Sequence, residues 1–309
     1  MFSAMTTPTR QPIVPAGWQP TRPRWKWVVA TGGAVVGLLA IWLFAVWPPP
    51  LWYRWFWPHQ TAFMAMRREQ SDSLARHVER KREAVDGVLP RHYQPVPLTA
   101  MAPTLPQAVL IAEDHRFFEH SGIDYQAIRQ ALGYRRDAFE WDSPRDRAEM
   151  RKVLGQVWAR RERIRGASTI TQQLAKNLYL SPSRNPLRKI KEAVTAYRLE
   201  TALGKNRILE LYLNVVEFGP EVWGVEAAAK TYFGRSAARL SADQSAALAG
   251  TLPFPLRSNP GFRPGRMRWR QQLILRRLAG DPIQMPADTD SIDTTEPIDA
   301  DTTGTGSNR

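Results

Sequence analysis

The chain of 309 residues contains no cysteine. Disulfide bonds, thiol nucleophiles and cysteine-ligated metal sites are therefore excluded, and the protein is compatible with either side of a membrane. Alternation of apolar and polar residues with a period of two is also scarce, which argues against a β fold. The hydrophobic fraction of 43% is nevertheless enough for a real core.

Acidic residues are outnumbered by basic ones in the chain as a whole, but not at its C-terminal end. The net charge is +14, yet Asp281 to Arg309 holds seven acids and one base, so the other 280 residues carry +20. This acidic segment has little to bury, and residues 281–309 are predicted to be a disordered tail. A basic chain often binds nucleic acid, but basic residues beside a membrane span also follow anionic lipid. We expect no nucleic-acid partner.

One long hydrophobic run is present. From Trp27 to Trp47 the sequence has 21 residues without a charge, which at about 1.5 Å per residue is close to the roughly 30 Å of a bilayer core. We predict a transmembrane helix at 27–47. A cleaved signal peptide and a buried core helix are the alternatives, but the run exceeds a typical signal and lacks a polar face. Four basic residues precede it and favour a cytoplasmic segment 1–26: Arg10, Arg22, Arg24 and Lys26.

Residues 48–89 are predicted to be a juxtamembrane linker. The aromatic stretch from Pro48 to Trp57 suits either a membrane interface or a hydrophobic linker packed on the following domain. The sequence does not decide between these two interpretations. From Thr61 to Arg82 the pattern is charged and helical.

Residues 90–280 are predicted to form one all-α domain. Two capping boxes indicate helix starts, one at Thr169 with Gln172 and one at Ser241 with Gln244. The predicted helices are Gln107 to Phe118, Thr169 to Leu180, Leu187 to Leu203, Asn206 to Val216, Val225 to Tyr232 and Ala242 to Leu252.

Five sequence motifs lie in this domain. They are EDHRFFEHSG (113–122), GASTITQQLAKN (166–177), RKIKEA (188–193), RILELYLN (207–214) and GVEAAAKTYFG (224–234). In this order they resemble the motifs of the family 51 peptidoglycan glycosyltransferases. The monofunctional members are the most similar, since no Ser-x-x-Lys or Lys-Thr-Gly motif of a penicillin-binding domain follows. The resemblance implies a lysozyme-like helical glycosyltransferase domain that polymerises glycan from a lipid-linked disaccharide.

Two carboxylates are the catalytic candidates. Glu113 follows the apolar segment Ala108 to Ala112, where burial would raise its pKa and make it a proton acceptor near neutral pH. Taken alone, a Glu-Asp pair at the end of a helix is usually a solvated terminus. The resemblance makes it the general base, with Asp114 in a supporting, substrate-binding position, and places Glu192 near the donor pyrophosphate.

Glu192 lies three residues after Lys189, so both share one helix face. A surface ion pair is the alternative. The apolar residues Ile190, Val194 and Tyr197 form another stripe, which we expect to anchor this helix to the core.

A set of polar and basic residues is predicted to bind the substrate. Gln173 and Lys176 share a helix face, which would ordinarily be solvated. The resemblance makes both of them substrate ligands and adds Arg184 and Lys189 as further contacts to pyrophosphate. Three cations stabilise the charge that develops on a pyrophosphate leaving group. The implied reaction transfers the growing lipid-linked glycan to the 4-hydroxyl of lipid II, inverts the donor anomer to a β-1,4 bond and releases undecaprenyl pyrophosphate.

The remaining expectations for this domain concern metals, two further polar residues and one long connector. His115 and His120 show no ligand spacing, so no metal site and no required cofactor are expected, although divalent-cation stimulation is compatible with the resemblance. Glu210 and Asn214 either support the site or only pack and cap. The charged stretch Asp137 to Arg163 is longer than the family's usual connector, a region that commonly forms a flap.

The resemblance also implies a location and partners. It places the protein in the bacterial inner membrane with a periplasmic catalytic domain. That domain would bind lipid II and the growing lipid-linked glycan strand, and other cell-wall synthesis proteins are candidate partners. A peptidoglycan-cleaving enzyme on the same fold is one rival. A non-catalytic membrane scaffold is the other. The presence of Glu113, Glu192 and the cations favours the polymerase.

Overall fold

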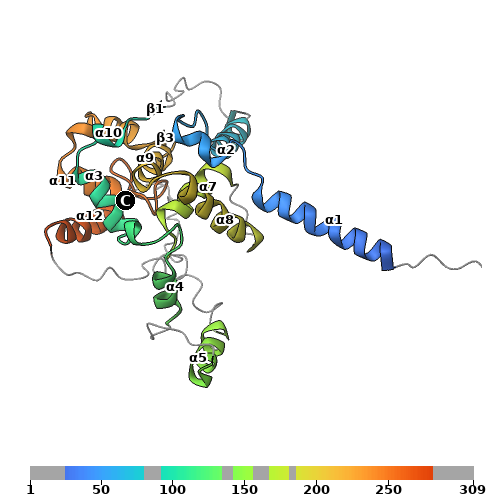
Figure 1. Cartoon of the computed structure of the whole chain (residues 1–309). Helices are drawn as coiled ribbons and strands as arrows, with labels where there is room; N and C mark the ends of the chain where they lie inside the picture. Colours follow the sequence, from blue (N-terminus) through green and yellow to red (C-terminus); the bar gives the residue numbers. More distant parts are fainter. Residues whose placement is uncertain (1–24, 80–91, 134–141, 156–166, 181–185, 281–309) are drawn as a thin grey trace, which may run out of the picture. The chain divides into compact units, whose positions relative to one another are not determined.

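The computed structural model describes residues 25–79, 92–133, 142–155, 167–180 and 186–280 (Figure 1). The chain divides into two compact units, residues 1–45 and residues 46–309, which are described separately. Helix α1 (Trp25–Phe44) is the described part of the first unit, and none of its residues is buried. Its mean hydropathy of 2.1 and its length fit a single-pass membrane anchor. The helix begins two residues before the predicted run and ends three residues before the end of that run.

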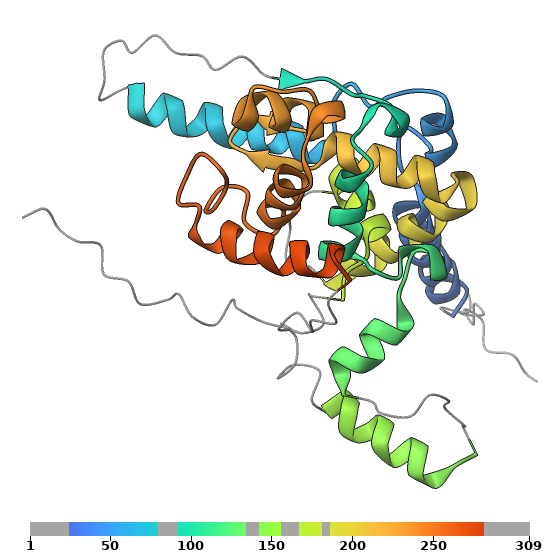
Figure 2. The same cartoon turned by 90° about the vertical axis from the view of Figure 1, so that its left-hand side faces the viewer.

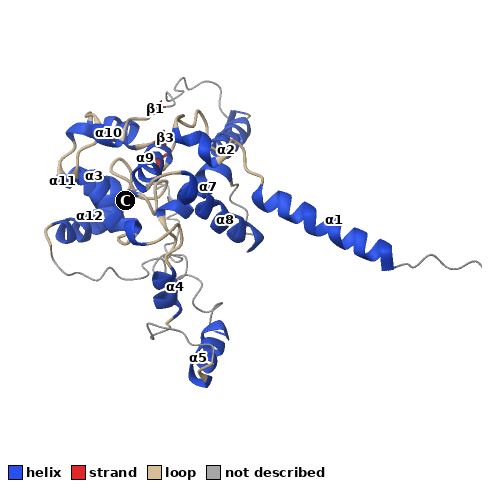
Figure 3. Cartoon of the chain, in the orientation of Figure 1, coloured by secondary structure: helices blue, strands red, loops and turns tan. Residues whose placement is uncertain are grey.

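The second unit is mostly helical, as predicted, with one small sheet (Figure 3). The sheet has the order β1-β3-β2, with β1 parallel and β2 antiparallel to β3. Its strands are β1 (His92–Tyr93), β2 (Glu217–Gly219) and β3 (Val222–Trp223). The α-helices are α2 (Ala62–Glu79), α3 (Thr104–Glu113), α4 (Tyr125–Leu132), α5 (Pro144–Gly155), α7 (Ile170–Tyr179), α8 (Pro186–Ala202), α9 (Lys205–Val215), α10 (Val225–Phe233), α11 (Ala242–Thr251) and α12 (Gly265–Leu278). The described residues of this unit also form four 3-10 helices: η1 (Pro50–Arg54), η2 (Leu98–Ala100), η3 (Phe117–Glu119) and η4 (Ala237–Arg239).

Two groups of helices build the core. In the first, α7 packs on α8, α9 and α2, and it buries Ile170, Leu174 and Leu178. In the second, α11 packs on α3 and α12, and every residue from Ser245 to Thr251 is buried. Figure 2 shows α12, in red, along one side of this second group, whereas α4 and α5 lie outside both groups. Helices α4 and α12 were not among the predicted helices.

Both predicted capping boxes are present, and one of them also closes a loop. Thr169 accepts the backbone N–H of Gln172 at 3.1 Å, and the Gln172 side chain accepts the N–H of Thr169 in return. The Thr169 hydroxyl donates to the carbonyl of Gly122 at 2.6 Å. The start of α7 is therefore fixed to the end of the loop that follows α3.

Gly224 allows a close approach between two backbone segments. Its φ is +80°, and an added Cβ would lie 2.4 Å from the carbonyl oxygen of Asn214. Its N–H donates to the carbonyl of Val216 at 2.9 Å. Only glycine fits both the backbone conformation and the available space.

Two expectations about helices were wrong. Helix α3 ends at Glu113 rather than at Phe118, because Asp114 leaves helical geometry (φ −163°, ψ 73°) and caps it. The apolar stripe of α8 does not anchor the helix, since Ile190 is 53% and Tyr197 is 58% exposed. The buried face of α8 is formed instead by Glu192, Thr195, Ala196 and Leu199.

Candidate active site

Glu113 is the first residue of a hydrogen-bonded chain that joins three helices. The side-chain amide of Gln173, on α7, donates to Glu113 Oε2 at 3.0 Å. The Tyr212 hydroxyl, on α9, donates to Gln173 Oε1 at 3.0 Å. Tyr212 is completely buried, so its hydroxyl fixes which end of the amide faces Glu113. The carboxylate therefore has a defined position and orientation.

The surroundings of Glu113 shift its proton affinity. Its side chain is 13% exposed, and burial raises its pKa above the ordinary value of 4.5, which was expected from the apolar helix before it. Three neighbours oppose this rise: Arg270, the hydrogen bond from Gln173, and Lys176. Arg270 Nη2 lies 3.6 Å from Glu113 Oε1. A largely buried carboxylate with a raised pKa and a fixed orientation can accept a proton.

Arg270 was not found from the sequence. It lies on α12, far along the chain from Glu113, and its Nη2 also approaches the carbonyl of Ala112 at 3.4 Å. No local pattern around residue 270 indicates this pairing. Only the packing of α12 against α3 brings the two residues together.

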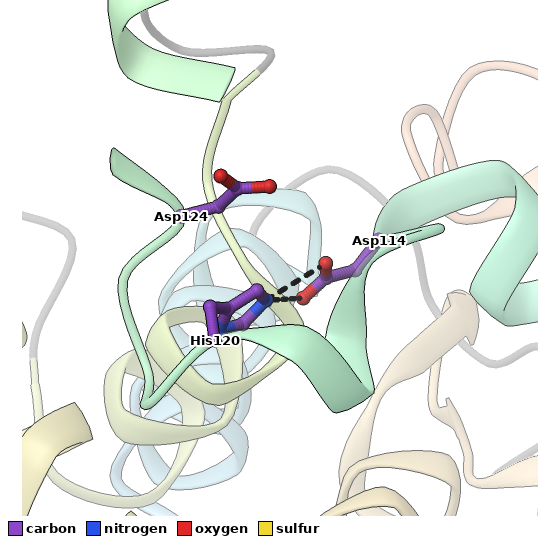
Figure 4. A group of neighbouring side chains, drawn as sticks. All are labelled: Asp114, His120 and Asp124. Atoms are coloured by element: carbon purple, nitrogen blue, oxygen red, sulfur yellow. Dashed lines mark hydrogen bonds and ion pairs between the residues drawn. The ribbon is translucent and has the colours of Figure 1, made fainter. Parts of the chain in front are cut away.

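Asp114 makes interior contacts that connect α3 to α7. Its Oδ2 accepts the backbone N–H of Ile170 at 3.0 Å, and His120 Nε2 lies 3.0 and 3.1 Å from its two oxygens (Figure 4). The side chain is 4% exposed. These contacts position the loop after Glu113, and the substrate-binding role of Asp114 stays a prediction.

His120 has carboxylate neighbours, contrary to expectation. One ligand atom each from Asp114, His120 and Asp124 lies within 4.8 Å of the others, a spacing that a metal ion could bridge. Each carboxylate already accepts a backbone N–H, from Ile170 to Asp114 and from Ala127 to Asp124. A cation would compete with these donors, and whether the protein uses a metal stays untested.

Glu192 is the second carboxylate of the site. Glu192 lies on α8 beside solvated residues, yet it is only 2% exposed. This burial excludes the alternative of a surface ion pair. Its Oε2 accepts from Arg188 Nη1 at 2.9 Å, and its Oε1 accepts from Lys189 Nζ. Lys189 Nζ also donates to Ser168 Oγ at 3.2 Å, which connects α8 to the start of α7. Arg188 was not among the predicted site residues.

Lys176 lies within electrostatic range of both carboxylates. Burial lowers the pKa of its ammonium group, Glu192 and Glu113 raise it, and Lys189 and Arg188 lower it. Lys176 follows Gln173 by three residues on α7, so the two side chains share a face as predicted. The remaining predicted pyrophosphate contact, Arg184, lies outside the described residues. Lys176, Arg188 and Lys189 form a cation cluster around Glu192 that can hold an anion.

Glu210 and Asn214 contact backbone groups away from Glu113. Asn214 accepts the N–H of Val96 at 2.8 Å and donates to its carbonyl at 2.9 Å. Glu210 accepts the N–H of Leu98 at 2.6 Å. These contacts correspond to the packing alternative, because they hold the segment that precedes α3 against α9.

Comparison with known proteins gives consistent matches over most of the chain. A family model described as Transglycosylase matches residues 82–143 and 138–279. A Biosynthetic peptidoglycan transglycosylase of Bordetella pertussis is 40% identical over 266 residues, which cover 84% of this chain and 97% of the relative. A protein of the same name from Thiobacillus denitrificans is 37% identical over 262 residues, covering 84% and 97%. Another, from Neisseria gonorrhoeae, is 35% identical over 266 residues, covering 86% and 98%.

Proposed function

Because this chain belongs to the transglycosylase family, we propose that it is a monofunctional, inverting peptidoglycan glycosyltransferase of family 51. One observation carries the proposal. Glu113, a largely buried carboxylate of raised pKa, lies within electrostatic range of Lys176, which belongs to the cation cluster around Glu192. A proton acceptor and an anion-binding group are the two components that transfer of a sugar from a pyrophosphate requires.

In the proposed reaction Glu113 takes the proton of the 4-hydroxyl of lipid II. The freed oxygen attacks the anomeric carbon of the growing lipid-linked glycan, a β-1,4 bond forms with inversion, and undecaprenyl pyrophosphate leaves with the electrons of the broken bond. Lys176, Lys189 and Arg184 stabilise the negative charge that develops on the leaving group. No atom changes its oxidation state in this reaction, so no redox cofactor is required.

The proposed location is the bacterial inner membrane. Helix α1 is the anchor, and the basic residues before it favour a cytoplasmic N-terminus and a periplasmic catalytic domain. Full-length protein should then resist extraction from membranes by high salt and carbonate but dissolve in detergent. Release by carbonate alone would contradict a retained anchor.

The direct test is polymer formation by the purified full chain from a lipid-linked disaccharide. We expect long glycan products, and we expect Lys176→Ala and Lys189→Ala to reduce their formation roughly ten- to a hundredfold, the range for losing a charge-assisted contact. Arg239→Ala is the matched control, because Arg239 is an exposed cation in η4. Cleavage of preformed glycan without polymerisation would support a hydrolase, and no reaction of either kind would support a scaffold.

A further inference from the structure

A block of positive charge closes the described part of the chain. Between Asp243 and Asp281 the sequence contains no acidic residue, lysine or histidine but seven arginines: Arg257, Arg263, Arg266, Arg268, Arg270, Arg276 and Arg277. Five of them lie on α12, where Arg270 is paired with Glu113 at 3.6 Å. A block of one charge sign on a folded domain attracts a partner of the opposite sign.

The outer side of α12 carries a row of polar and basic side chains. Arg268, Gln272 and Arg276 are spaced four residues apart, which places them on one face of the helix, and all three are exposed. The other side is buried through Met267 and Ile274, where α12 packs on α11 and α3. Within the described residues, neither Arg268 nor Arg276 makes an ion pair. Both guanidinium groups are therefore available to an anion.

The loop before α12 adds two exposed arginines, Arg257 and Arg263. The backbone N–H of Met267 donates to Ser258 Oγ at 3.0 Å, and that hydroxyl donates to the carbonyl of Arg263 at 2.9 Å. These bonds fix the loop to the first turn of α12. The guanidinium of Arg263 lies over the ring of Phe262, 5.3 Å from its centroid. We call these four exposed arginines the arginine surface: Arg257, Arg263, Arg268 and Arg276.

The chain supplies an acidic partner directly after α12. The acidic segment 281–309, which lies outside the described residues, holds seven acids and one base. It begins three residues after Leu278, the last residue of α12, and beyond residue 279, where the match to the transglycosylase family model ends. Gly280, at φ +93°, follows the helix in a left-handed turn, which allows the chain to change direction. Extended, the segment reaches roughly 100 Å, several times the length of α12, about 21 Å.

The tether makes weak ion pairs sufficient for binding. A single exposed ion pair contributes only about 0–1 kcal/mol. A partner joined by a short flexible linker, however, has an effective concentration in the millimolar range. Several pairs can then hold the segment without apolar contacts, which suits a segment with little to bury. Such binding weakens with salt, because the Debye length falls from about 10 Å at 0.1 M to about 3 Å at 1 M.

We propose that the arginine surface is the docking site of the chain's own acidic segment 281–309. The occupant is chosen by charge complementarity and by its attachment next to α12. The proposal does not depend on the proposed reaction. Its consequence is that the docked segment shields the arginine surface from other polyanions.

Carbodiimide coupling in the full chain, in detergent micelles, tests the contact. The reagent joins a carboxylate to a lysine amine in contact with it but does not couple arginine, so Arg268→Lys with Arg276→Lys introduces reactive amines without changing the charge. Arg235→Lys with Arg239→Lys is the matched control, because both of these arginines are exposed near η4. Peptide mass spectrometry identifies the coupled pairs.

We expect positions 268 and 276 to couple to acids of the segment at least about fivefold more than the control positions at low salt, and this excess should disappear at 1 M salt. Equal coupling in the two variants would overturn the proposal, since the segment would then have no preferred site. Coupling confined to covalent dimers would also overturn it, because the partner would be a second copy of the chain.

Elution of the full chain from immobilised heparin tests the shielding. Replacing the acids of 281–309 by their amides should raise the salt concentration needed for elution. Adding Arg268→Ala and Arg276→Ala should lower it at least about twofold more in this amide variant than in the parent, because only the variant leaves the arginine surface open. Arg235→Ala with Arg239→Ala should lower it equally in both backgrounds. An equal effect of the 268 and 276 changes in both backgrounds would show that the segment does not cover these arginines.

Discussion

Replacing Glu113 tests the charge and the position of the proposed base separately. Glu113→Gln removes the charge but keeps the length, and its carbonyl oxygen can still accept from Gln173 over the present 3.0 Å. The contact with Arg270, at 3.6 Å, loses its ionic partner. Glu113→Asp keeps the charge but withdraws the carboxylate by one carbon–carbon bond, about 1.5 Å. The contact with Gln173 would then be about 4.5 Å, beyond hydrogen-bonding range.

Both variants should lose activity for different reasons. Loss of a general base costs roughly 10²-fold or more, which corresponds to about 2.7 kcal/mol in the activation barrier. Displacement of a reacting group by about 1 Å can cost a similar factor. We therefore expect a decrease of at least ~10²-fold in polymerisation rate for each, measured with lipid-linked disaccharide under conditions where the parent is linear in time.

Glu113→Gln should lower activity but raise the stability of the folded protein near neutral pH. Burial raises the pKa of Glu113 in the folded protein, so its protonated form is favoured there. The contribution of Glu113 to stability is present below its ordinary pKa and is lost as pH rises through the folded value. The glutamine variant lacks this loss, so its melting temperature should rise relative to the parent as pH increases towards neutral. Near-normal turnover in this variant would refute the assignment of Glu113 as the base.

Three further predictions concern residues around the site. Tyr212→Phe leaves the side-chain carbonyl of Gln173 without its donor, which should lower the free energy of unfolding by about 1–3 kcal/mol and the melting temperature by roughly 2–12 °C. The variant should also reduce kcat more than it changes KM. An unchanged melting temperature would contradict the role of the hydroxyl. Gly224→Ala would add a Cβ 2.4 Å from a backbone carbonyl oxygen at φ +80°, and it should lower the free energy of unfolding by more than about 3 kcal/mol. Gly234→Ala, at φ +62° with open space around it, should lower it by only about 1 kcal/mol in the same denaturant titration. Equal losses in the two variants would show that the steric argument fails. Burial raises the pKa of Glu217 to about 7, so the stability of the parent should decline as pH rises from about 4.5 to 7. The stability of Glu217→Gln should decline less over the same range. Parallel profiles of stability against pH for the two proteins would rule out this role of Glu217.

Local sequence patterns predicted the features that depend on neighbours along the chain. The capping boxes at Thr169 and Ser241 were confirmed, because the partners lie three residues apart and the hydrogen bonds form within one helical turn. The raised pKa of Glu113 also followed from the apolar segment before it. In both cases the physical cause lies within a few residues of its effect.

Features that depend on packing between distant segments could not be predicted in this way. Arg270 and Tyr212 approach Glu113 and Gln173 from α12 and α9, and no spacing in the sequence relates them. The stripe containing Ile190 was recognised, but periodicity shows only that a helix has an apolar face. Whether protein or another medium covers that face depends on what else packs there.

The hydrogen bond from Thr169 to the carbonyl of Gly122 has a consequence for how this enzyme can be engineered. It joins the two ends of the segment between these residues at 2.6 Å, so Glu113 before the segment and Gln173 after it keep their relative positions independently of what lies between. The entropy of closing a loop grows only with the logarithm of its length, and a doubling adds about 0.6 kcal/mol. The segment is therefore a suitable place to insert a folded reporter domain without changing the distance between the two halves of the site.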